Sequence, residues 1–364
     1  MKLIALKDVC KINMGQSPNS SSYNDYGDGM PFFQGNADFG ERYPITRVWC
    51  NTPTKIAQAE DILISVRAPI GALNYAKEEC CIGRGLAAIT PDRNKVSQDF
   101  IYWALKGKKA ELNDKGNGST FKAISRKILE ETMIPDINFE QQHKCAENLE
   151  KIYGIIQNRR KELLALDDLI KARFVEMFGD MIINPNGWGK VLLGEACDVR
   201  DGTHDSPKYF TEGYPLVTSK NVTGGKIDFA DCSLICEEDY NKINQRSKVD
   251  MGDILMPMIG TVGNPVIVDI EAEFAIKNVA LIKFRENSTV INSFVKALLE
   301  SDYFDRAVIS KVRGGTQKFI SLGDIRKLEI CLPPIAVQEQ FSDFAKQVDK
   351  SKVAVQKALD ETQT

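Results

Sequence analysis

The residue types that most often perform catalysis are sparse in this sequence. The chain contains two histidines, His143 and His204, and neither stands in a metal-binding or nucleophile-activating pattern. There is no Gly-x-x-x-x-Gly-Lys-[Ser/Thr] loop for a nucleotide phosphate, and no Gly-x-Gly-x-x-Gly follows a strand pattern. The segment Asn184-Pro185-Asn186-Gly187 lacks the second proline and the aromatic residue of an amino-methyltransferase signature, and it is typical of a turn. These patterns favour a binding protein and predict no catalytic, cofactor-binding or metal-binding residue.

The composition is that of a globular protein rather than of a general nucleic-acid coat. Hydrophobic residues make up 43% of the chain, which is enough for buried cores. The formal net charge is −3, so any affinity for DNA must come from local basic patches. The nine cysteines form no metal-binding pattern, and we expect buried free thiols. We also expect no membrane span and no export signal, because no apolar run is long enough for either.

The strongest pattern is an internal duplication, because the same landmarks recur in the same order with offsets of 187 to 199 residues. The first copy opens with Leu6-Lys7-Asp8-Val9-Cys10 and the second with Leu193-Gly194-Glu195-Ala196-Cys197. The further matching pairs are Gly15 and Gly202, Asp61 and Asp253, Gly71 and Gly263, residues 82–89 and 275–282, Gly118 and Gly314, and Glu140 and Glu339. Repeats of this length indicate two copies of one structural unit.

Each copy has two parts. The first part mixes short β-branched and aromatic runs with turn-forming residues, which predicts an α/β (α+β) domain with one helix at 98–112 or 294–301. The second part follows a proline, where helix starts are favoured, and predicts a long helix. The sequence therefore predicts tandem domains at 1–139 and 181–334, with long helices at 140–180 and 335–364. The second helix is expected to be shorter, because the sequence ends soon after Glu339.

Apolar residues on the two predicted long helices recur at alternating spacings of three and four. Such a narrow stripe is typical of a coiled coil, whereas a helix that packs on its own globular domain should show a wider one. Arg159, Arg173 and Ser351 occupy slots of the same series. The predicted seam residues are Leu149, Ile152, Ile156, Leu163, Leu166, Ile170 and Met177 in the first helix and Phe341, Phe344, Val348, Val355 and Ala358 in the second.

In this order, the landmarks resemble the specificity subunit of type I restriction–modification systems over the whole chain. No single motif is strong alone, but their order, repeated twice, is specific. The resemblance implies two target-recognition domains, each reading one half of a split double-stranded DNA site. It also implies two helices that pair antiparallel as a ruler and a docking platform. The most specific stretches are residues 186–188, 193–195 with Gly202, 252–255, and 314–321 leading into Pro333-Pro334.

The resemblance also implies partners. Two methyltransferase subunits would bring S-adenosylmethionine and flip the target adenine, and separate restriction subunits with ATP and Mg would join for cleavage. This chain would hold none of these cofactors, contact no membrane and lie in the cytoplasm of a prokaryote. Two alternatives remain open: the recognition subunit of a related two-subunit (type IIB-like) restriction enzyme, and a coiled-coil adaptor without DNA specificity. Family members often carry a fuller final helix than this one.

DNA-reading residues are expected where the two copies differ most, because diverged domains should read different half-sites. Base edges are read by side chains such as Arg, Asn, Gln, Ser and Thr, whereas contacts to the DNA backbone position the protein. Any one of these candidates could instead be a solvated loop side chain. The candidates are Gln16, Ser17, Tyr23, Gln34, Asn36 and Arg47 in copy one and Thr203, His204, Lys208, Thr218, Ser219, Lys220 and Asn221 in copy two.

Lys122 and Lys318 occupy equivalent places beside a glycine-containing turn in both copies. A residue kept by domains that read different sequences should do a common job, and a lysine near glycine amides suits a phosphate. A purely structural turn fits equally well. The remaining candidates for contacts to the DNA backbone are Arg67, Arg84 and Arg313.

Overall fold

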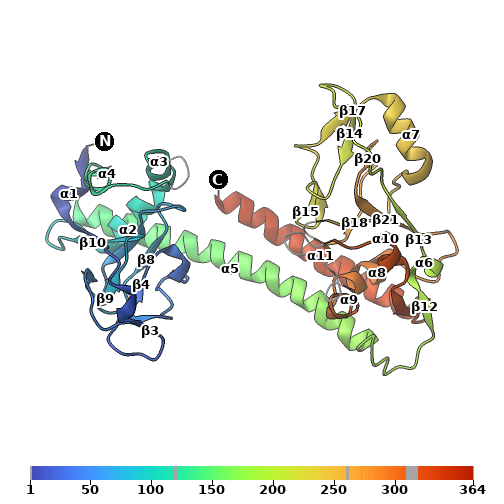
Figure 1. The fold of residues 1–364 in the computed structure, drawn as a ribbon, viewed down its shortest axis with the longest axis horizontal. Coiled ribbons are helices and arrows are strands. Elements are labelled where there is room, and N and C mark those ends of the chain that lie inside the picture. The colour runs from blue at the N-terminus through green and yellow to red at the C-terminus, as the bar shows by residue number, and fades with distance from the viewer. Residues whose placement is uncertain (1, 118–121, 260–261, 272, 309–318, 364) are drawn as a thin grey trace. The chain divides into compact units, whose positions relative to one another are not determined.

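The computed structural model describes residues 2–117, 122–259, 262–271, 273–308 and 319–363. The chain divides into two compact units, Met1–Ile155 (unit 1) and Ile156–Thr364 (unit 2). Both units combine strands with helices, which confirms the predicted mixed α/β class. One 40-residue helix, α5 (Phe139–Phe178), begins in unit 1 and ends in unit 2 (Figure 1). The finer division into 1–139, 140–180, 181–334 and 335–364 stays a prediction.

Unit 1 contains an antiparallel sheet in the order β2-β10-β7-β8. A second sheet, in the order β3-β5-β4-β9-β6, includes one parallel pair, β4 with β9, and a short antiparallel ladder joins β1 to β11. The strands are β1 (Leu3–Ala5), β2 (Cys10–Met14), β3 (Tyr23–Asn24), β4 (Met30–Phe33), β5 (Trp49–Cys50), β6 (Ile56–Ala57), β7 (Ile62–Ser65), β8 (Leu73–Tyr75), β9 (Cys80–Ile82), β10 (Leu86–Pro91) and β11 (Met133–Pro135).

Unit 2 contains an antiparallel sheet in the order β13-β21-β18-β19. A sheet in the order β17-β14-β20 includes the parallel pair β14–β20, and two-stranded ladders join β12 to β22 and β15 to β16. The strands are β12 (Lys190–Leu192), β13 (Asp198–Asp201), β14 (Tyr214–Val217), β15 (Val222–Thr223), β16 (Lys226–Ile227), β17 (Ser233–Ile235), β18 (Ile254–Pro257), β19 (Val266–Ile267), β20 (Ala275–Ile276), β21 (Val279–Lys283) and β22 (Glu329–Cys331).

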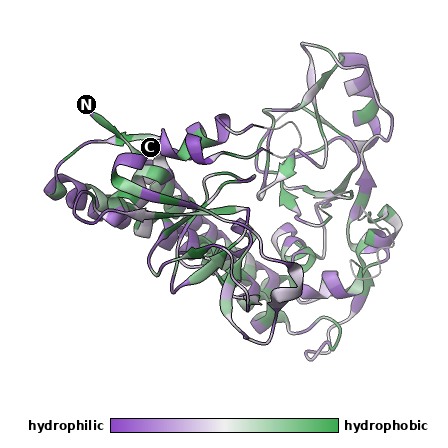
Figure 2. Ribbon diagram, turned by 60° about the vertical axis from the view of Figure 1, so that its left-hand side comes forward, coloured by the Kyte–Doolittle hydropathy of each residue, from purple (hydrophilic) through white to green (hydrophobic). Residues whose placement is uncertain are grey.

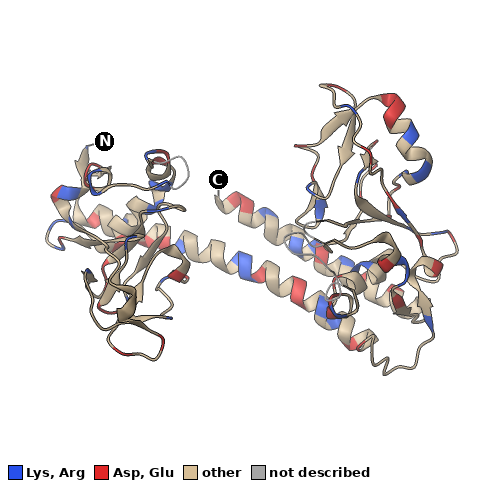
Figure 3. Ribbon diagram, viewed as in Figure 1, with Lys and Arg blue, Asp and Glu red and all other residues tan. Residues whose placement is uncertain are grey.

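The two units repeat one order of elements, which confirms the predicted duplication. The sheet β2-β10-β7-β8 corresponds to β13-β21-β18-β19, the ladder β1–β11 to β12–β22, and the parallel pair β4–β9 to β14–β20. Helix α7 carries acidic residues in its first turn and Arg246 in its last (Figure 3). The helices are α1 (Leu6–Val9), α2 (Gln98–Gly107), α3 (Lys109–Asp114), α4 (Arg126–Glu130) and α5 in the first copy, and α6 (Leu193–Ala196), α7 (Glu237–Ser247), α8 (Asn292–Leu299), α9 (Asp302–Ala307), α10 (Leu322–Arg326) and α11 (Ile335–Gln363) in the second.

The predicted helix at 98–112 is corrected to two shorter helices, α2 and α3. The chain leaves the helical conformation at Lys108, directly after Gly107, and glycine weakens a helix at that point. Its predicted counterpart at 294–301 is found as α8. The apolar faces of α2 and α8 pack into the main cores of their units, where the strands are mostly hydrophobic (green in Figure 2).

All nine cysteines are free thiols, and six of them are buried. Burial raises the pKa of Cys10, Cys80 and Cys197 to about 12 in each case. Cys145, on the first part of α5, is the exposed thiol.

A buried glutamine fixes the start of α5. The Gln142 side chain is 3% exposed, accepts a hydrogen bond from the Ser97 N–H at 2.7 Å and donates one to the Ile137 carbonyl at 2.8 Å. Ser97 immediately precedes α2, so the glutamine binds the start of the long helix to the start of its neighbour.

Gln338 does the same for α11. Fully buried, it accepts a hydrogen bond from the Ile291 N–H at 3.0 Å and donates to the carbonyls of Thr289 and Pro333 at 3.0 and 2.9 Å. Ile291 immediately precedes α8, the counterpart of α2.

These glutamines correct the alignment of the two copies. The sequence pattern pairs Glu140 with Glu339, but both of these side chains are exposed. The hydrogen bonds instead pair Gln142 with Gln338. The register of the repeat follows the buried glutamines, because each accepts a hydrogen bond from the residue that precedes the equivalent helix, α2 or α8.

Within unit 2, the last part of α5 packs antiparallel on α11. The residue numbers of the contacts fall along α5 as they rise along α11, so the two helices run in opposite directions. Charged residues of both signs are spread along both helices (Figure 3). The contacts are Phe178 with Phe341 at 5.5 Å between ring centroids, the Arg173 guanidinium over the Phe344 ring at 5.6 Å, and Asp167 with Lys352 at 2.6 Å.

The buried stripe of α11 differs in part from the predicted seam. Phe341, Val348 and Val355 are buried as expected for seam residues. The other positions of the stripe are Ala345, Lys352 and Leu359, one residue later than the predicted Phe344, Ser351 and Ala358. Phe344 and Ala358 are half-buried, and Phe344 contacts Arg173 of α5. Lys352, which is partly buried and paired with Asp167, explains why the predicted stripe is shifted. A hydrophobicity pattern does not recognise a lysine as part of an apolar stripe.

On α5, the predicted seam residues fall into two groups. Ile156, Leu163, Leu166 and Ile170 are half-buried in unit 2. Leu149 and Ile152 are 38% and 42% exposed within unit 1. Their place in the seam stays a prediction, because α11 belongs to unit 2.

We predict that Gln338→Ala lowers the free energy of unfolding by about 3 kcal/mol, because it leaves a buried N–H and two buried carbonyls without partners. Chemical denaturation measures the change. The matched control is Glu339→Ala, an exposed neighbour on the same helix, for which we expect a change within about 0.5 kcal/mol. Equal losses in the two variants would contradict the role of the buried glutamine.

Candidate nucleic-acid interface

Three segments of unit 1 meet where two parallel strands end. β4 and β9 run parallel, so their carboxyl ends lie at the same edge of the sheet. Backbone hydrogen bonds continue beyond the strands and add the end of β2. These bonds run from Gly83 N–H to the Phe33 carbonyl (2.8 Å), from Gly85 N–H to the Gln34 carbonyl (3.1 Å) and from Gln16 N–H to the Ile82 carbonyl (3.0 Å). Residues 16–17, 34–36 and 83–85 thus form one surface, which we call the unit 1 edge.

The segments approach too closely for any residue except glycine at several positions. A Cβ on Gly85 would lie 2.4 Å from the Gln34 carbonyl oxygen, and one on Gly15 would lie 2.2 Å from the Gly83 carbonyl oxygen. In unit 2 a Cβ on Gly202 would lie 2.1 Å from the Ile276 carbonyl oxygen. The matching glycines of the repeat, Gly15 and Gly202, are therefore explained by close backbone contact.

Side-chain hydrogen bonds hold the unit 1 edge in one conformation. Ser17 Oγ accepts hydrogen bonds from Gln34 Nε2 at 2.9 Å and from the Arg84 N–H at 3.3 Å. The Asp38 carboxylate accepts from the N–H groups of Gln34 and Gly35 at 2.8 and 3.3 Å. The loop is thus ordered from within, while the side chains of Gln34 and Arg84 stay exposed.

A cavity of about 210 Å³ opens on this edge. Arg67 and Arg84 are exposed there, and the Ala68 N–H donates to the Lys122 carbonyl at 3.1 Å, which places Lys122 on the neighbouring segment. In the described part of the chain, no carboxylate forms an ion pair with these three basic residues. The lining residues are Gln34, Gly35, Asn36, Arg67, Ala68, Arg84 and Gly85.

Unit 2 forms the same edge with different side chains. The Lys277 N–H donates to the Val217 carbonyl at 2.9 Å and the Thr203 N–H to the Ile276 carbonyl at 3.0 Å, as Gly83 and Gln16 do in unit 1. Thr203 and His204 therefore replace Gln16 and Ser17, residues 218–220 replace 34–36, and Lys277 and Asn278 stand where unit 1 has the three residues 83–85. Residues 203–204, 218–220 and 277–278 form the unit 2 edge.

His204 lies between two hydrogen-bond acceptors. Its Nδ1 is 2.8 Å from Asn278 Oδ1 and its Nε2 is 2.9 Å from Asp201 Oδ2. The hydrogen bond to Asn278, followed by that to Asp201, raises the pKa of His204 above its ordinary value. Two acceptors on one imidazole favour the doubly protonated, cationic ring.

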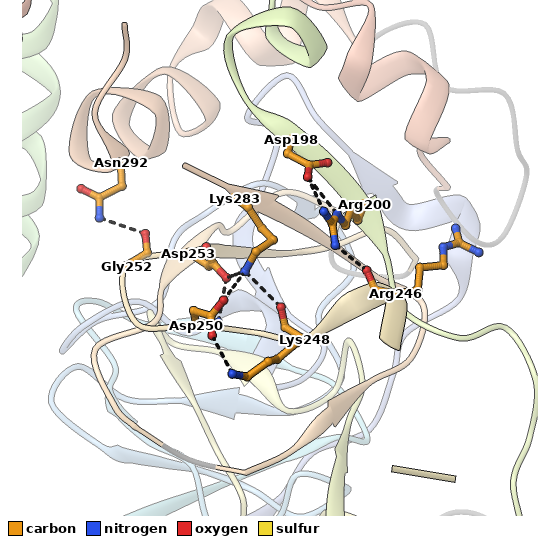
Figure 4. Close-up of polar contacts among 9 residues, drawn as sticks. All are labelled: Asp198, Arg200, Arg246, Lys248, Asp250, Gly252, Asp253, Lys283 and Asn292. Carbon is orange, nitrogen blue, oxygen red and sulfur yellow. Dashed lines mark hydrogen bonds and ion pairs between the residues drawn. The ribbon is translucent and has the colours of Figure 1, made fainter. Parts of the chain in front are cut away.

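Asp201 is itself held by the surrounding structure. Its carboxylate pairs with Arg246 at the end of α7, and the Arg246 carbonyl accepts a hydrogen bond from Arg200 at 2.8 Å. Figure 4 shows Arg200 in contact with both Asp198 and Arg246. This part of unit 2 therefore connects the unit 2 edge to α7.

A second charged group lies next to it in Figure 4. The Lys283 ammonium, on β21, contacts Asp250 at 2.8 Å and also contacts Asp253. The hydrogen bond from Lys283 lowers the pKa of Asp250, whereas burial raises the pKa of Asp253. These contacts bind the turn before β18 to β21 and support the sheet beneath the unit 2 edge.

Two candidate readers are corrected by the structure. The Tyr23 ring stacks on Phe32 with centroids 4.7 Å apart, and its hydroxyl donates to the Pro18 carbonyl at 2.9 Å. Asn221 is 6% exposed, and its Oδ1 accepts hydrogen bonds from the N–H and the hydroxyl of Thr218. Both side chains are occupied in holding the loops, so they are not free to meet a base.

The other candidates divide between the edges and the remaining surface. Gln16, Ser17, Gln34, Asn36, Arg67 and Arg84 come together in unit 1, and Thr203, His204, Thr218, Ser219 and Lys220 come together in unit 2. Arg47 donates to the Ala37 carbonyl at 3.4 Å and lies beside the loop of Asn36. Lys208 is exposed, without a contact to the unit 2 edge among the described residues. Arg313 and Lys318 lie outside the described residues.

Sequence reasoning missed Asn278 and Asp201. Asn278 falls inside the segment 275–282, which the repeat matched to 82–89 as a shared strand, so its hydrogen bond to His204 was overlooked. A positive φ of 55° at Asn278 marks the turn between β20 and β21. Asp201 resembles a surface acid in the sequence, and its burial is set by contacts with distant residues.

Among the described residues, no group of three or more His, Cys, Asp or Glu is placed to hold a metal ion. Over the same residues, no helix combines the length and the apolar character needed to span a membrane.

A family model described as the type I restriction modification DNA specificity domain matches residues 1–166 and 185–362. The chain belongs to this family. The two matched stretches each contain one copy of the repeated unit and one of the two edges, and the resemblance seen in the sequence is confirmed.

Individual members of the specificity-domain family match over different spans. The MjaX specificity subunit described in Methanocaldococcus jannaschii is 47% identical over 152 residues, which are 42% of this chain and 36% of that protein. The chain thus spans about a third of that relative's length. The EcoBI specificity subunit of Escherichia coli is 21% identical over 95% of this chain and 80% of that protein. A crystal structure of an S subunit from M. genitalium shares the fold, with a TM-score of 0.58 and 16% identity over 100% of this chain and 92% of that one.

We predict that Asp201→Asn lowers the pKa of His204, because the neutral amide stabilises the cationic ring less than a carboxylate does. NMR titration of the two histidine rings measures the change, and His143 serves as the internal control. In the wild type, Asn278 and Asp201 stabilise the folded protein through the cationic His204 ring. This stabilisation is fully present below the ordinary histidine pKa and is lost as pH rises through the raised value. An unchanged His204 titration would show that Asp201 does not hold the ring.

Proposed function

We propose that this chain is the DNA sequence-specificity subunit of a type I restriction–modification complex. Unit 1 reads one half of a bipartite DNA site and unit 2 reads the other. The observation that carries the proposal is the pair of edges: one backbone arrangement, formed twice by parallel strands and close glycine contacts, presents two different sets of polar side chains.

This arrangement suits readout of two unrelated short sequences. A rigid backbone holds the reading side chains in place, and their hydrogen-bonding groups select the base edges. Arg67, Arg84 and Gln34 line the unit 1 edge. The unit 2 edge instead carries Thr218, Ser219, Lys220, Lys277 and Asn278, with His204 beside them. Different side chains on one frame should recognise different half-sites.

Chemistry on the DNA is assigned to partner subunits. Two methyltransferase subunits supply S-adenosylmethionine and methylate adenine, and restriction subunits with ATP and Mg cleave the DNA. The chain itself acts in the cytoplasm without catalysis, as the sparse catalytic residues of its sequence suggest. The family description, a DNA specificity domain, favours this function over a coiled-coil adaptor.

The long helices supply the docking platform of the complex. α5 and α11 carry mixed charges along their exposed sides, as surfaces that meet another protein often do, and their contact is anchored in the core of unit 2 by Phe178 and Phe341. Exposed apolar residues on them, Leu164 at 65% and Val353 at 70%, add apolar area to the surface offered to a partner.

The test is co-expression of the full chain with the methyltransferase subunit of its system, followed by genome-wide mapping of methylated adenine. We expect one bipartite motif with two different half-sites and a fixed gap. The isolated chain should bind DNA weakly, because the wider contact area of the complex is missing. No motif with the partner present, or tight specific binding by the chain alone, would overturn the proposal.

We predict that Ser219→Ala with Lys220→Ala changes only the half-site read by unit 2, because both side chains lie on its edge. Each lost base contact should cost about 1–3 kcal/mol of discrimination. The matched control, Asn221→Ala, should instead lower the stability of the protein, because it leaves the partly buried Thr218 N–H unpaired. Methylation mapping and thermal unfolding separate the two effects, and a change in both half-sites would contradict the assignment.

A further inference from the structure

The two edges differ in the arginines of unit 1. Arg84 has no counterpart in unit 2, because three residues, 83–85, separate the matching positions Ile82 and Leu86, whereas only Lys277 and Asn278 separate Ile276 and Val279. Arg67 is replaced by Ile259: Ile124 N–H donates to the Val66 carbonyl at 2.9 Å, and Ile320 N–H donates to the Met258 carbonyl at 3.0 Å, which aligns the two following residues. At the unit 1 edge, Arg67 therefore stands where unit 2 has an isoleucine, and Arg84 is an additional residue.

This difference bears on what the arginines contact. The phosphate backbone is the same along every DNA sequence, so a phosphate contact should be kept by both units. A base contact should differ between units that read different half-sites. Lys122 and Lys318 follow the first pattern, since both copies keep a lysine there. Arg67 and Arg84 follow the second pattern.

The geometry of the unit 1 edge also suits specific hydrogen bonds to a base better than nonspecific electrostatic attraction to DNA. Arg84 stands between Gly83 and Gly85, and its own N–H is bonded to Ser17 Oγ, so its backbone is fixed. The Val66 N–H donates to the Gly85 carbonyl at 2.9 Å, which joins the segments of Arg67 and Arg84 side by side. Both side chains are exposed at one cavity, and no carboxylate within the described residues neutralises them.

We propose that Arg67 and Arg84 are guanine-reading residues of the half-site recognised by unit 1, and not contacts to the DNA backbone. The inference rests on the proposed function and deepens it. Guanine presents two acceptors, N7 and O6, in the major groove, and the planar guanidinium fork matches them with two parallel hydrogen bonds. Unit 2, with Ile259 in place of Arg67 and no residue in place of Arg84, makes no such demand at the equivalent positions of its own half-site.

Gln34 supports this selection from the same cavity. One side of its amide is held by Ser17 Oγ, so the side chain is oriented before DNA arrives. An oriented neighbour limits where the arginines can reach, because a long side chain beside a fixed group has fewer positions to occupy. The unit 1 edge therefore combines two flexible cationic readers with one fixed polar neighbour.

The test uses the full chain co-expressed with its methyltransferase subunit. It compares wild type with Arg67→Ile, which installs the residue of unit 2, and with Arg84→Asn, which removes the guanidinium. We expect guanine in the wild-type half-site of unit 1. Each variant should methylate sites that lack one of these guanines, with activity on the original site reduced roughly 5- to 150-fold. The other half-site and the gap should stay unchanged.

Two further variants separate base contacts from phosphate contacts. Lys122→Ala should weaken binding of the complex to every sequence and reduce the slope of log affinity against log salt by about one, without changing the motif. Arg93→Ala, an exposed arginine paired with Glu60 away from the cavity, should leave the motif and the salt dependence as in wild type.

The outcomes distinguish the two levels of inference. If Arg67→Ile and Arg84→Asn weaken all sequences alike and lower the salt slope as Lys122→Ala does, the arginines are phosphate contacts and the inference is overturned. A unit 1 half-site without guanine overturns it as well. A wild-type complex that yields no bipartite motif overturns the proposed function itself. Circular dichroism of each variant confirms that the fold is retained.

Discussion

Two hydrogen-bonded parallel strands have their carboxyl ends at the same edge of the sheet. The unit 1 edge and the unit 2 edge both depend on this constraint. The pairs β4–β9 and β14–β20 bring loops together that are distant in sequence. Close glycine contacts at Gly15 and Gly202 then add the end of a third strand to each edge. The polar side chains at each edge are neighbours because the backbone leaves them no other arrangement.

The two units share what is buried and differ in what is exposed. Gln142 and Gln338 hold the long helices in the same way, and the carboxylates of Asp61 and Asp253 each accept a hydrogen bond at 2.8 Å from the N–H three residues earlier. The exposed side chains at the edges have no such matching partners in the fold. Their divergence therefore costs little stability, which allows one frame to present two chemistries.

The duplication, the mixed α/β class and the long helices could be predicted because they leave periodic or repeated patterns in the sequence. The exact stripe of α11 could not, since Lys352 enters it through a pairing with Asp167 that spans distant residues. The edges were predicted as groups of loop residues, and most of those residues meet. Tyr23 and Asn221 were misassigned because a polar loop residue that orders the backbone looks the same in sequence as one that faces a ligand.

The distribution of thiols has a practical consequence for spectroscopy. Reaction with maleimides or iodoacetamides requires an accessible thiolate, and burial suppresses both access and ionisation at Cys10, Cys80 and Cys197. Cys145 is exposed on the first part of α5. The natural protein thus offers an exposed attachment point for a fluorophore or spin label on its longest helix, with the half-buried Cys232 and Cys236 as the remaining accessible thiols.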